Sequence, residues 1–239
     1  MLNYHKPHTN VLVQMVILFV LTFIPAVLGY TQTKPDALEQ YRLGRDLENR
    51  GRTQEAQPFY NEAIRICSDE IAKGEGTRDS YTVLTWTLQR QLKYAEVIVW
   101  GERALRQFGD DYRIIQIMGE AYFYLNDYDR SLRFMQNYLN SMPQGDRAGI
   151  SFFFVGEIFR LRNKFYLADM AYSTAVKLEP GTALWWYRLG TVREAYGDLP
   201  LAAESYEQAL KYNPNYQQAR NNLDRIRPTA PEIPPTDTL

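Results

Sequence analysis

The sequence predicts an all-α protein, a solenoid of helix–turn–helix units that follow one another along the chain. A small residue directly follows a large apolar one at intervals of 41, 34, 37 and 34 residues. The apolar positions around it recur at i, i+3, i+4 and i+7, which is the spacing of a helix and not of a strand. A proline or glycine follows the second apolar segment in four of the five units, where it would end a helix. The small residues are Gly44, Thr85, Gly119, Gly156 and Gly190.

These positions divide the chain into five units and a final helix. A polar turn such as Asn126-Asp127 or Gly197-Asp198 is expected to separate the two helices of a unit. A last helix is expected to cover the apolar surface that the fifth unit leaves open. The predicted boundaries are 30–36 for a linker, 37–77, 78–111, 112–148, 149–182 and 183–216 for the units, 217–227 for the solvating helix, and 228–239 for an extended, disordered Pro-rich tail.

The small residues also predict how the helices of a unit pack. A glycine lets the two backbones approach closely, and a large aromatic side chain on the other helix fills the remaining space. The first unit departs from the pattern, because Pro58 falls about one turn into its second helix and should bend it. The stretch Lys73–Thr77 is inserted after that helix, and we expect it to be a loop.

The N-terminal segment is apolar and carries no charge between Thr9 and Thr33. Lys6 precedes this run and Pro25 interrupts it, as in an export signal. Val27 and Gly29 would then occupy the −3 and −1 positions of a cleavage site.

Residues 1–29 are therefore expected to be a signal peptide or, alternatively, an uncleaved membrane anchor. The anchor remains open because the apolar run over residues 11–28 is about 18 residues long, the lower limit for spanning a bilayer. In both cases the repeat array is expected in the periplasm or at the extracytoplasmic face of the membrane.

The composition excludes most catalytic chemistry. The chain has one cysteine, Cys67, and two histidines, His5 and His8, which both lie in the first ten residues. The repeat array therefore has no histidine base, no Ser-His or Cys-His pair and no histidine metal ligand. A formal net charge of −1 and the lack of a basic stripe argue against nucleic-acid binding. We expect no enzyme activity, no cofactor and no metal.

The recurring residues resemble the tetratricopeptide repeat family, over residues 37 to about 227. The resemblance implies a right-handed α-solenoid that binds protein, either an extended peptide or a partner helix, in a concave groove lined by the first helix of each unit. The last two units carry the pattern most completely, with Phe152, Val155, Gly156, Phe159, Ala168, Tyr172, Ala175 and Pro180 in the fourth and Trp186, Leu189, Gly190, Ala202, Tyr206, Ala209 and Pro214 in the fifth.

The same resemblance indicates which residues line the groove. Aromatic and arginine side chains are prominent among them, and these are the types that dominate binding energy at interfaces. The implied groove residues are Tyr41, Arg45, Trp86, Arg90, Arg113, Gln116, Glu120, Phe123, Tyr124, Phe153, Glu157, Arg160, Tyr187 and Glu194.

Some of these residues have a second interpretation. Trp86 either anchors a partner or packs on the neighbouring unit. Glu120, Glu157 and Glu194 share one side of the array, where carboxylates can act as acid and base or hold a cation. The expected state is that these glutamates are either solvated or paired with arginine.

Some family members hold the carboxylate of chaperone tails with Lys and Asn. Here only Arg45 and Arg113 supply cations at the corresponding positions, and we expect that clamp to be absent. The predicted function is a non-enzymatic scaffold for protein binding in the cell envelope. The alternative is self-association into a homo-oligomer through aromatic side chains, among which Phe154 and Trp185 are off register and are expected to be exposed.

Overall fold

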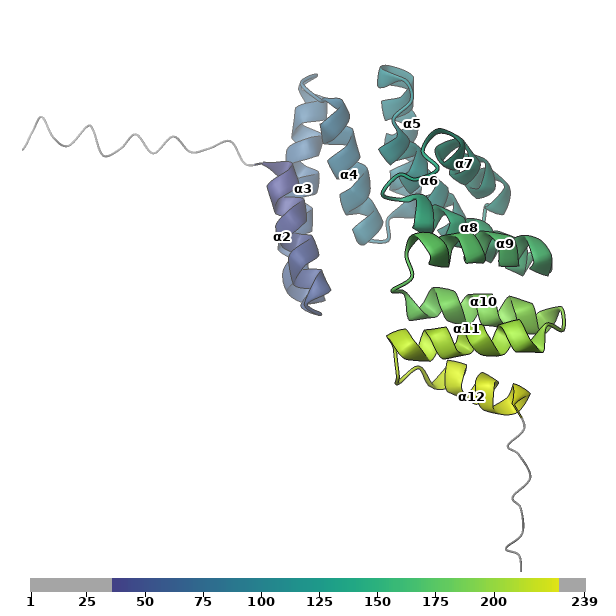
Figure 1. The fold of residues 1–239 in the computed structure, drawn as a ribbon. Coiled ribbons are helices and arrows are strands. Elements are labelled where there is room, and N and C mark those ends of the chain that lie inside the picture. The colour runs from purple at the N-terminus through teal and green to yellow at the C-terminus, as the bar shows by residue number, and fades with distance from the viewer. Residues whose placement is uncertain (1–35, 228–239) are drawn as a thin grey trace, which may run out of the picture. The chain divides into compact units, whose positions relative to one another are not determined.

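The computed structural model describes residues 36–227, all of which from Ala37 on belong to one compact unit. The predicted signal or anchor at residues 1–29 and the predicted tail at 228–239 lie outside the described residues. Residues 36–227 contain helices and no strand, which confirms the all-α class (Figure 1). None of these helices is long and apolar enough to cross a membrane.

The helices come as five pairs and a single last helix. Each helix packs against the next one along the chain, and α2, α4, α6 and α8 also contact one another in series. The pairs are α2 (Ala37–Asn49) with α3 (Thr53–Ala72), α4 (Arg78–Arg90) with α5 (Tyr94–Phe108), α6 (Tyr112–Tyr124) with α7 (Tyr128–Ser141), α8 (Ala148–Leu161) with α9 (Phe165–Leu178) and α10 (Ala183–Ala195) with α11 (Leu199–Tyr212), followed by α12 (Gln217–Ile226). We call each pair a repeat and number the repeats one to five.

Side-chain caps define where several helices begin. Thr77 and Ser80 form a reciprocal capping box at the start of α4. Asp111, Asp127 and Asp198 each accept a hydrogen bond from a first-turn backbone N–H, at the starts of α6, α7 and α11. The stretch Lys73–Thr77 is a loop between α3 and α4, as predicted.

The turn inside each repeat contains one residue in the left-handed backbone region. This conformation favours glycine and is tolerated by asparagine. Leucine at this position in repeat two is therefore the exception. The five residues are Gly51, Leu92, Asn126, Asn163 and Gly197.

The predicted packing of small against aromatic residues is confirmed. A Cβ atom added to Gly190 would lie 2.5 Å from a ring carbon of Tyr206, and one on Gly156 would lie 2.6 Å from Tyr172. Both tyrosines are fully buried. The glycines of the first helices thus provide the space that the tyrosine rings of the second helices occupy.

Two aromatic residues lie differently from what the sequence predicts. Phe154 and Trp185 are buried, with 4% and 5% of their surface exposed, so the expectation that they are exposed is wrong. Phe154 packs edge-on against Phe123 of α6, and Trp185 stacks on Phe153 of α8 at a centroid distance of 5.3 Å. Neither residue occupies one of the recurring core positions of a repeat, because each one packs against the preceding repeat.

Candidate functional site

The first helices of the repeats carry all fourteen residues that the resemblance places in a groove. The structure gives these residues very different degrees of burial, which decides which of them a partner can reach. Exposed are Arg45, Arg90, Arg113 and Tyr124; half-buried are Trp86, Phe123, Arg160, Tyr187 and Glu194; buried are Tyr41, Gln116, Glu120, Phe153 and Glu157.

Glu120 is held by neighbours on three sides. Its carboxylate accepts hydrogen bonds from Gln116 Nε2 at 2.5 Å and from Gln89 Nε2 of the preceding repeat at 2.8 Å. It also pairs with Arg147, which directly precedes α8. A carboxylate this fully bonded contributes to the contact between repeats and has little capacity left for a ligand.

Glu157 is likewise used within the array. Arg160 of the same helix lies 2.8 Å from it, and Arg188 of the next repeat lies 3.0 Å from it. The Tyr172 hydroxyl also donates to this carboxylate. Burial and then the charge of Glu157 raise the pKa of Tyr172, so this tyrosine stays protonated as a donor.

The same arrangement occurs at both ends of the array. Tyr206 donates to Glu194 at 2.8 Å, and Arg225 of α12 forms an ion pair with the same carboxylate. In repeat one, Tyr60 donates to Glu48 at 2.7 Å. Of the two expected states, solvated or arginine-paired, the structure shows arginine pairing for Glu120, Glu157 and Glu194.

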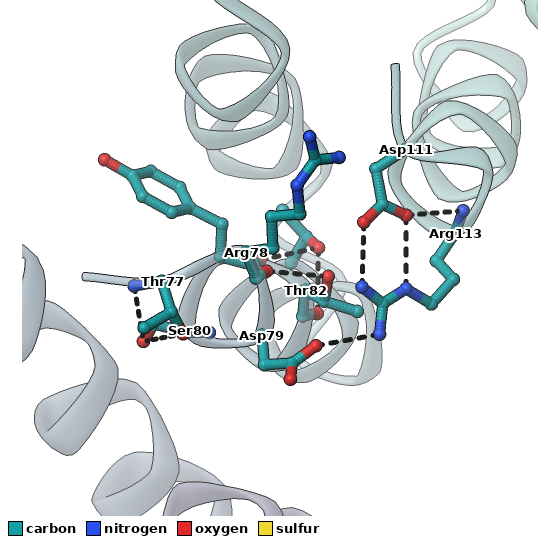
Figure 2. A network of polar contacts seen from close by, with 9 residues as sticks. Thr77, Arg78, Asp79, Ser80, Thr82, Asp111 and Arg113 are labelled. Carbon is teal, nitrogen blue, oxygen red and sulfur yellow. Dashed lines mark hydrogen bonds and ion pairs between the residues drawn. The ribbon is translucent and has the colours of Figure 1, made fainter. Parts of the chain in front are cut away.

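Arg113 is also engaged inside the protein. Figure 2 shows its guanidinium between Asp111, 2.8 Å away, and Asp79 of the preceding repeat, 2.9 Å away. Burial alone would raise the pKa of Asp111, but hydrogen bonds from Arg113 and from two backbone amides outweigh burial and lower it. Since Arg113 already has two carboxylate partners, the expectation that the chaperone-tail clamp is absent gains support.

The first helices of repeats one and two are different. The Tyr41 and Trp86 rings lie 5.7 Å apart and join α2 to α4. Arg45 lies 5.8 Å from the centre of the Tyr41 ring, and within residues 36–227 it has no ion pair. Arg90 contacts Glu48 at 3.4 Å, the longest arginine–carboxylate contact on this face. We call Tyr41, Arg45, Trp86 and Arg90 the α2–α4 patch.

The α2–α4 patch combines an aromatic surface with cationic groups that remain accessible. Nearby Tyr41 and Glu48 outweigh burial and raise the pKa of Arg90, which therefore stays charged. Half-exposed Trp86 packs on Tyr41 and still presents part of its ring, so both interpretations of this residue hold in part. Chemically, the patch can accept a carboxylate next to an apolar or aromatic side chain.

Sequence reasoning missed the three arginines that close the rest of the face. Arg147, Arg188 and Arg225 come from different positions in their repeats, so no periodic signal marks them. Within residues 36–227, no three His, Cys, Asp or Glu side chains gather as a metal ion requires.

Comparison with known proteins agrees with this architecture. Residues 183–222 match the family described as tetratricopeptide repeat. A stretch of 56 residues is 38% identical to the chloroplastic tetratricopeptide repeat domain-containing protein PYG7 of Arabidopsis thaliana, covering 23% of this chain and 19% of that protein.

Two solved structures are similar in fold. The Cut9–Hcn1 heterotetramer of APC/C superposes with a TM-score of 0.65 at 17% identity, over 80% of this chain and 36% of that chain. YrrB, described as a TPR protein with an unusual peptide-binding site, superposes with a TM-score of 0.52 at 17% identity, over 78% of this chain and 91% of that chain. The helical array therefore shares its fold with these structures, and its fifth repeat matches the tetratricopeptide repeat family.

Proposed function

We propose that this chain is a non-enzymatic scaffold that binds an acidic peptide segment on the α2–α4 patch. The segment would be extended, and would place a carboxylate against Arg45 and Arg90 and an apolar or aromatic side chain against the exposed part of Trp86. Peptide binding by YrrB supports the proposal as an example of the same fold in a peptide-binding protein.

The observation that carries the proposal is the unequal use of charge along the first helices. In repeats three to five, Glu120, Glu157 and Glu194 are each paired with an arginine of the array. In repeat one, exposed Arg45 lies on the Tyr41 ring and forms no ion pair within residues 36–227. Arginine beside a partly exposed tryptophan such as Trp86 is a combination that dominates binding energy at protein interfaces.

A displayed library of random peptides tests this proposal without knowledge of the natural partner. Selection uses the full chain, and the enriched peptides are then measured against the triple variant Arg45→Ala/Trp86→Ala/Arg90→Ala. We expect the enriched peptides to contain Asp or Glu beside an aromatic or large apolar residue, and to lose at least tenfold in affinity for the triple variant.

The matched control is Val99→Ala/Arg103→Ala, which changes two exposed residues of α5 outside the patch. This variant should bind like the wild type. Equal binding of the enriched peptides to the wild type and the triple variant would exclude the patch as the binding site.

We further propose that the array works outside the cytoplasm, in the cell envelope. The support is the uncharged run from Thr9 to Thr33 with Lys6 before it. A fusion of alkaline phosphatase to the C-terminus should be active, and N-terminal sequencing should find a mature chain that begins after Gly29. A full-length N-terminus with active phosphatase would indicate the anchor, and an inactive fusion would contradict export.

A further inference from the structure

Glu48 of α2 places a carboxylate at the edge of the α2–α4 patch. It lies one helical turn after Arg45, so the two side chains are neighbours on the surface of α2. The buried Tyr60 hydroxyl donates to its Oε2 at 2.7 Å, and Arg90 contacts the same oxygen at 3.4 Å. Burial and then the hydrogen bond to Glu48 raise the pKa of Tyr60, so this hydroxyl stays protonated and keeps the carboxylate in place.

Glu48 differs from the groove glutamates of repeats three to five in having a free oxygen. In Glu120, Glu157 and Glu194, both carboxylate oxygens are bonded to donors of the array. Among residues 36–227, no hydrogen bond or ion pair reaches Oε1 of Glu48, and its side chain is 25% exposed. The array therefore leaves one oxygen of this carboxylate available to a ligand.

Two arginines and one glutamate leave the patch with a single net positive charge. Arg45 forms no ion pair within residues 36–227, so its guanidinium can receive a ligand carboxylate. Arg90 already faces Glu48. One ligand carboxylate would thus neutralise the patch, whereas a second would meet Glu48 as a like charge. The other charged residues of α2 and the position after it balance one another; they are Glu39, Arg42, Asp46 and Arg50.

We infer that Glu48 restricts the α2–α4 patch to peptides with a single carboxylate. Its charge disfavours a second carboxylate beside the first, and its free Oε1 accepts a cationic or N–H group of the ligand at that place instead. The selected segment carries one Asp or Glu for Arg45, an apolar or aromatic side chain for Trp86, and no run of acidic residues. The inference rests on the peptide binding proposed above.

A second peptide selection tests this specificity. The full wild-type chain and the full-length Glu48→Gln variant are each selected against the same random library. Glutamine keeps the shape of the side chain and an acceptor for the Tyr60 hydroxyl, so the variant removes the charge. We expect the wild type to enrich peptides with one acidic residue, and the variant to enrich peptides with two or more acidic residues in succession as well.

The outcome separates this inference from the proposed function. Acidic runs enriched equally by the wild type and Glu48→Gln would overturn the role of Glu48 and leave peptide binding on the patch intact. Enriched peptides without any acidic residue would contradict the proposed function itself, and the inference with it.

Matched forms of one enriched peptide measure the effect on affinity. The residue next to the acidic one, on the side away from the apolar residue, is changed to Asp, Asn or Lys. We expect the Asp form to bind the wild type at least fivefold more weakly than the Asn form, and both to bind Glu48→Gln within twofold of each other. Equal losses in both proteins would overturn the inference. The Lys form should bind the wild type at least twofold more tightly than the Asn form, and the absence of this gain would contradict acceptance by Oε1.

Glu194→Gln is the matched control, because Glu194 has the same local arrangement in repeat five. Each glutamate lies twelve residues before the tyrosine that donates to it, Tyr60 for Glu48 and Tyr206 for Glu194. This variant should discriminate between the Asp and Asn forms as the wild type does. Loss of the discrimination in Glu194→Gln would indicate a general effect of net charge and would overturn the assignment to Glu48.

Salt dependence of the wild type gives a readout that needs no variant. Raising the ionic strength from about 0.1 M to about 1 M shortens the screening length from about 10 Å to about 3 Å. Because Glu48 is partly exposed, the discrimination between the Asp and Asn forms should fall at least twofold. Discrimination that does not change with salt would contradict its electrostatic origin.

Discussion

At the scale of single residues, the fold depends on a few tightly matched positions. Gly44, Gly156 and Gly190 each lie under a buried tyrosine ring, where an added methyl group has no space. The tyrosine hydroxyls reach Glu48, Glu157 and Glu194, so each pair provides both packing and a hydrogen bond. Substitutions here act on stability before they act on binding.

Gly190→Val should destabilise the protein by about 1–3 kcal/mol, because its side chain overlaps the Tyr206 ring. Urea unfolding followed by circular dichroism measures the change. Gly181→Ala is the control, since a Cβ there meets no atom within 4 Å. Equal stability of Gly190→Val and the wild type would mean that α10 and α11 are less closely packed than described.

The Asp111→Asn variant tests the negative charge of Asp111 alone. Asparagine can still cap helix α6, so the substitution removes the charge and keeps the cap. The lowered pKa of Asp111 means that its carboxylate stabilises the folded state above the unfolded pKa of about 3.9, and that this contribution is lost as the pH falls through the lowered value. We expect the variant to be about 1–2 kcal/mol less stable at pH 7.

The difference in unfolding free energy between the wild type and Asp111→Asn should begin to shrink below about pH 4, where Asp111 of the unfolded chain takes up its proton, and should disappear as the pH falls through the lowered folded pKa. Unfolding curves at pH 7, 5 and 3 measure this dependence. A difference that is the same at all three values would contradict the role of the Asp111 charge.

At the scale of helices, much of the order could be predicted from the sequence. Small residues in a fixed register predict that the two helices of a repeat pack closely. The prediction is correct because each glycine and the tyrosine that packs on it lie in the same repeat, at a fixed separation in the sequence. The contacts between repeats could not be predicted in the same way. Phe154 and Trp185 fill gaps whose shape depends on the neighbouring repeat, and Arg147 and Arg188 reach glutamates from non-periodic positions.

The last helix, α12, covers the open side of repeat five. Ala219 is fully buried beside Tyr206 and Ala209. Ala219→Glu places an unpaired charge there and should cost about 3 kcal/mol. Gln218→Glu adds the same charge at an exposed position of α12 and should change stability by less than about 0.5 kcal/mol. Similar thermal unfolding of both variants would show that α12 does not cover the array.

At the scale of the whole array, each repeat contacts mainly its neighbours, so the stability of the array depends on each contact between successive repeats. Trp185 and Phe153 join repeats four and five through stacked rings. Trp185→Ala should therefore cost about 3–5 kcal/mol and separate the unfolding of repeat five from that of the other repeats.

Trp86→Ala is the comparison, since Trp86 is half-buried and lies in the α2–α4 patch. It should cost about 1–2 kcal/mol and leave a single unfolding transition. Calorimetry measures both variants. Loss of the folded state in Trp86→Ala would assign this residue to packing and remove it from the binding site.

The central claim, protein binding on the α2–α4 patch, is tested most directly by photocrosslinking in intact cells. A benzoylphenylalanine placed at position 45, 86, 99 or 187 of the full chain reports which face meets a partner. We predict one adduct of defined mass from positions 45 and 86 and none from 99 or 187. Adducts from 99 alone, or adducts only with a second copy of the chain, would contradict the claim.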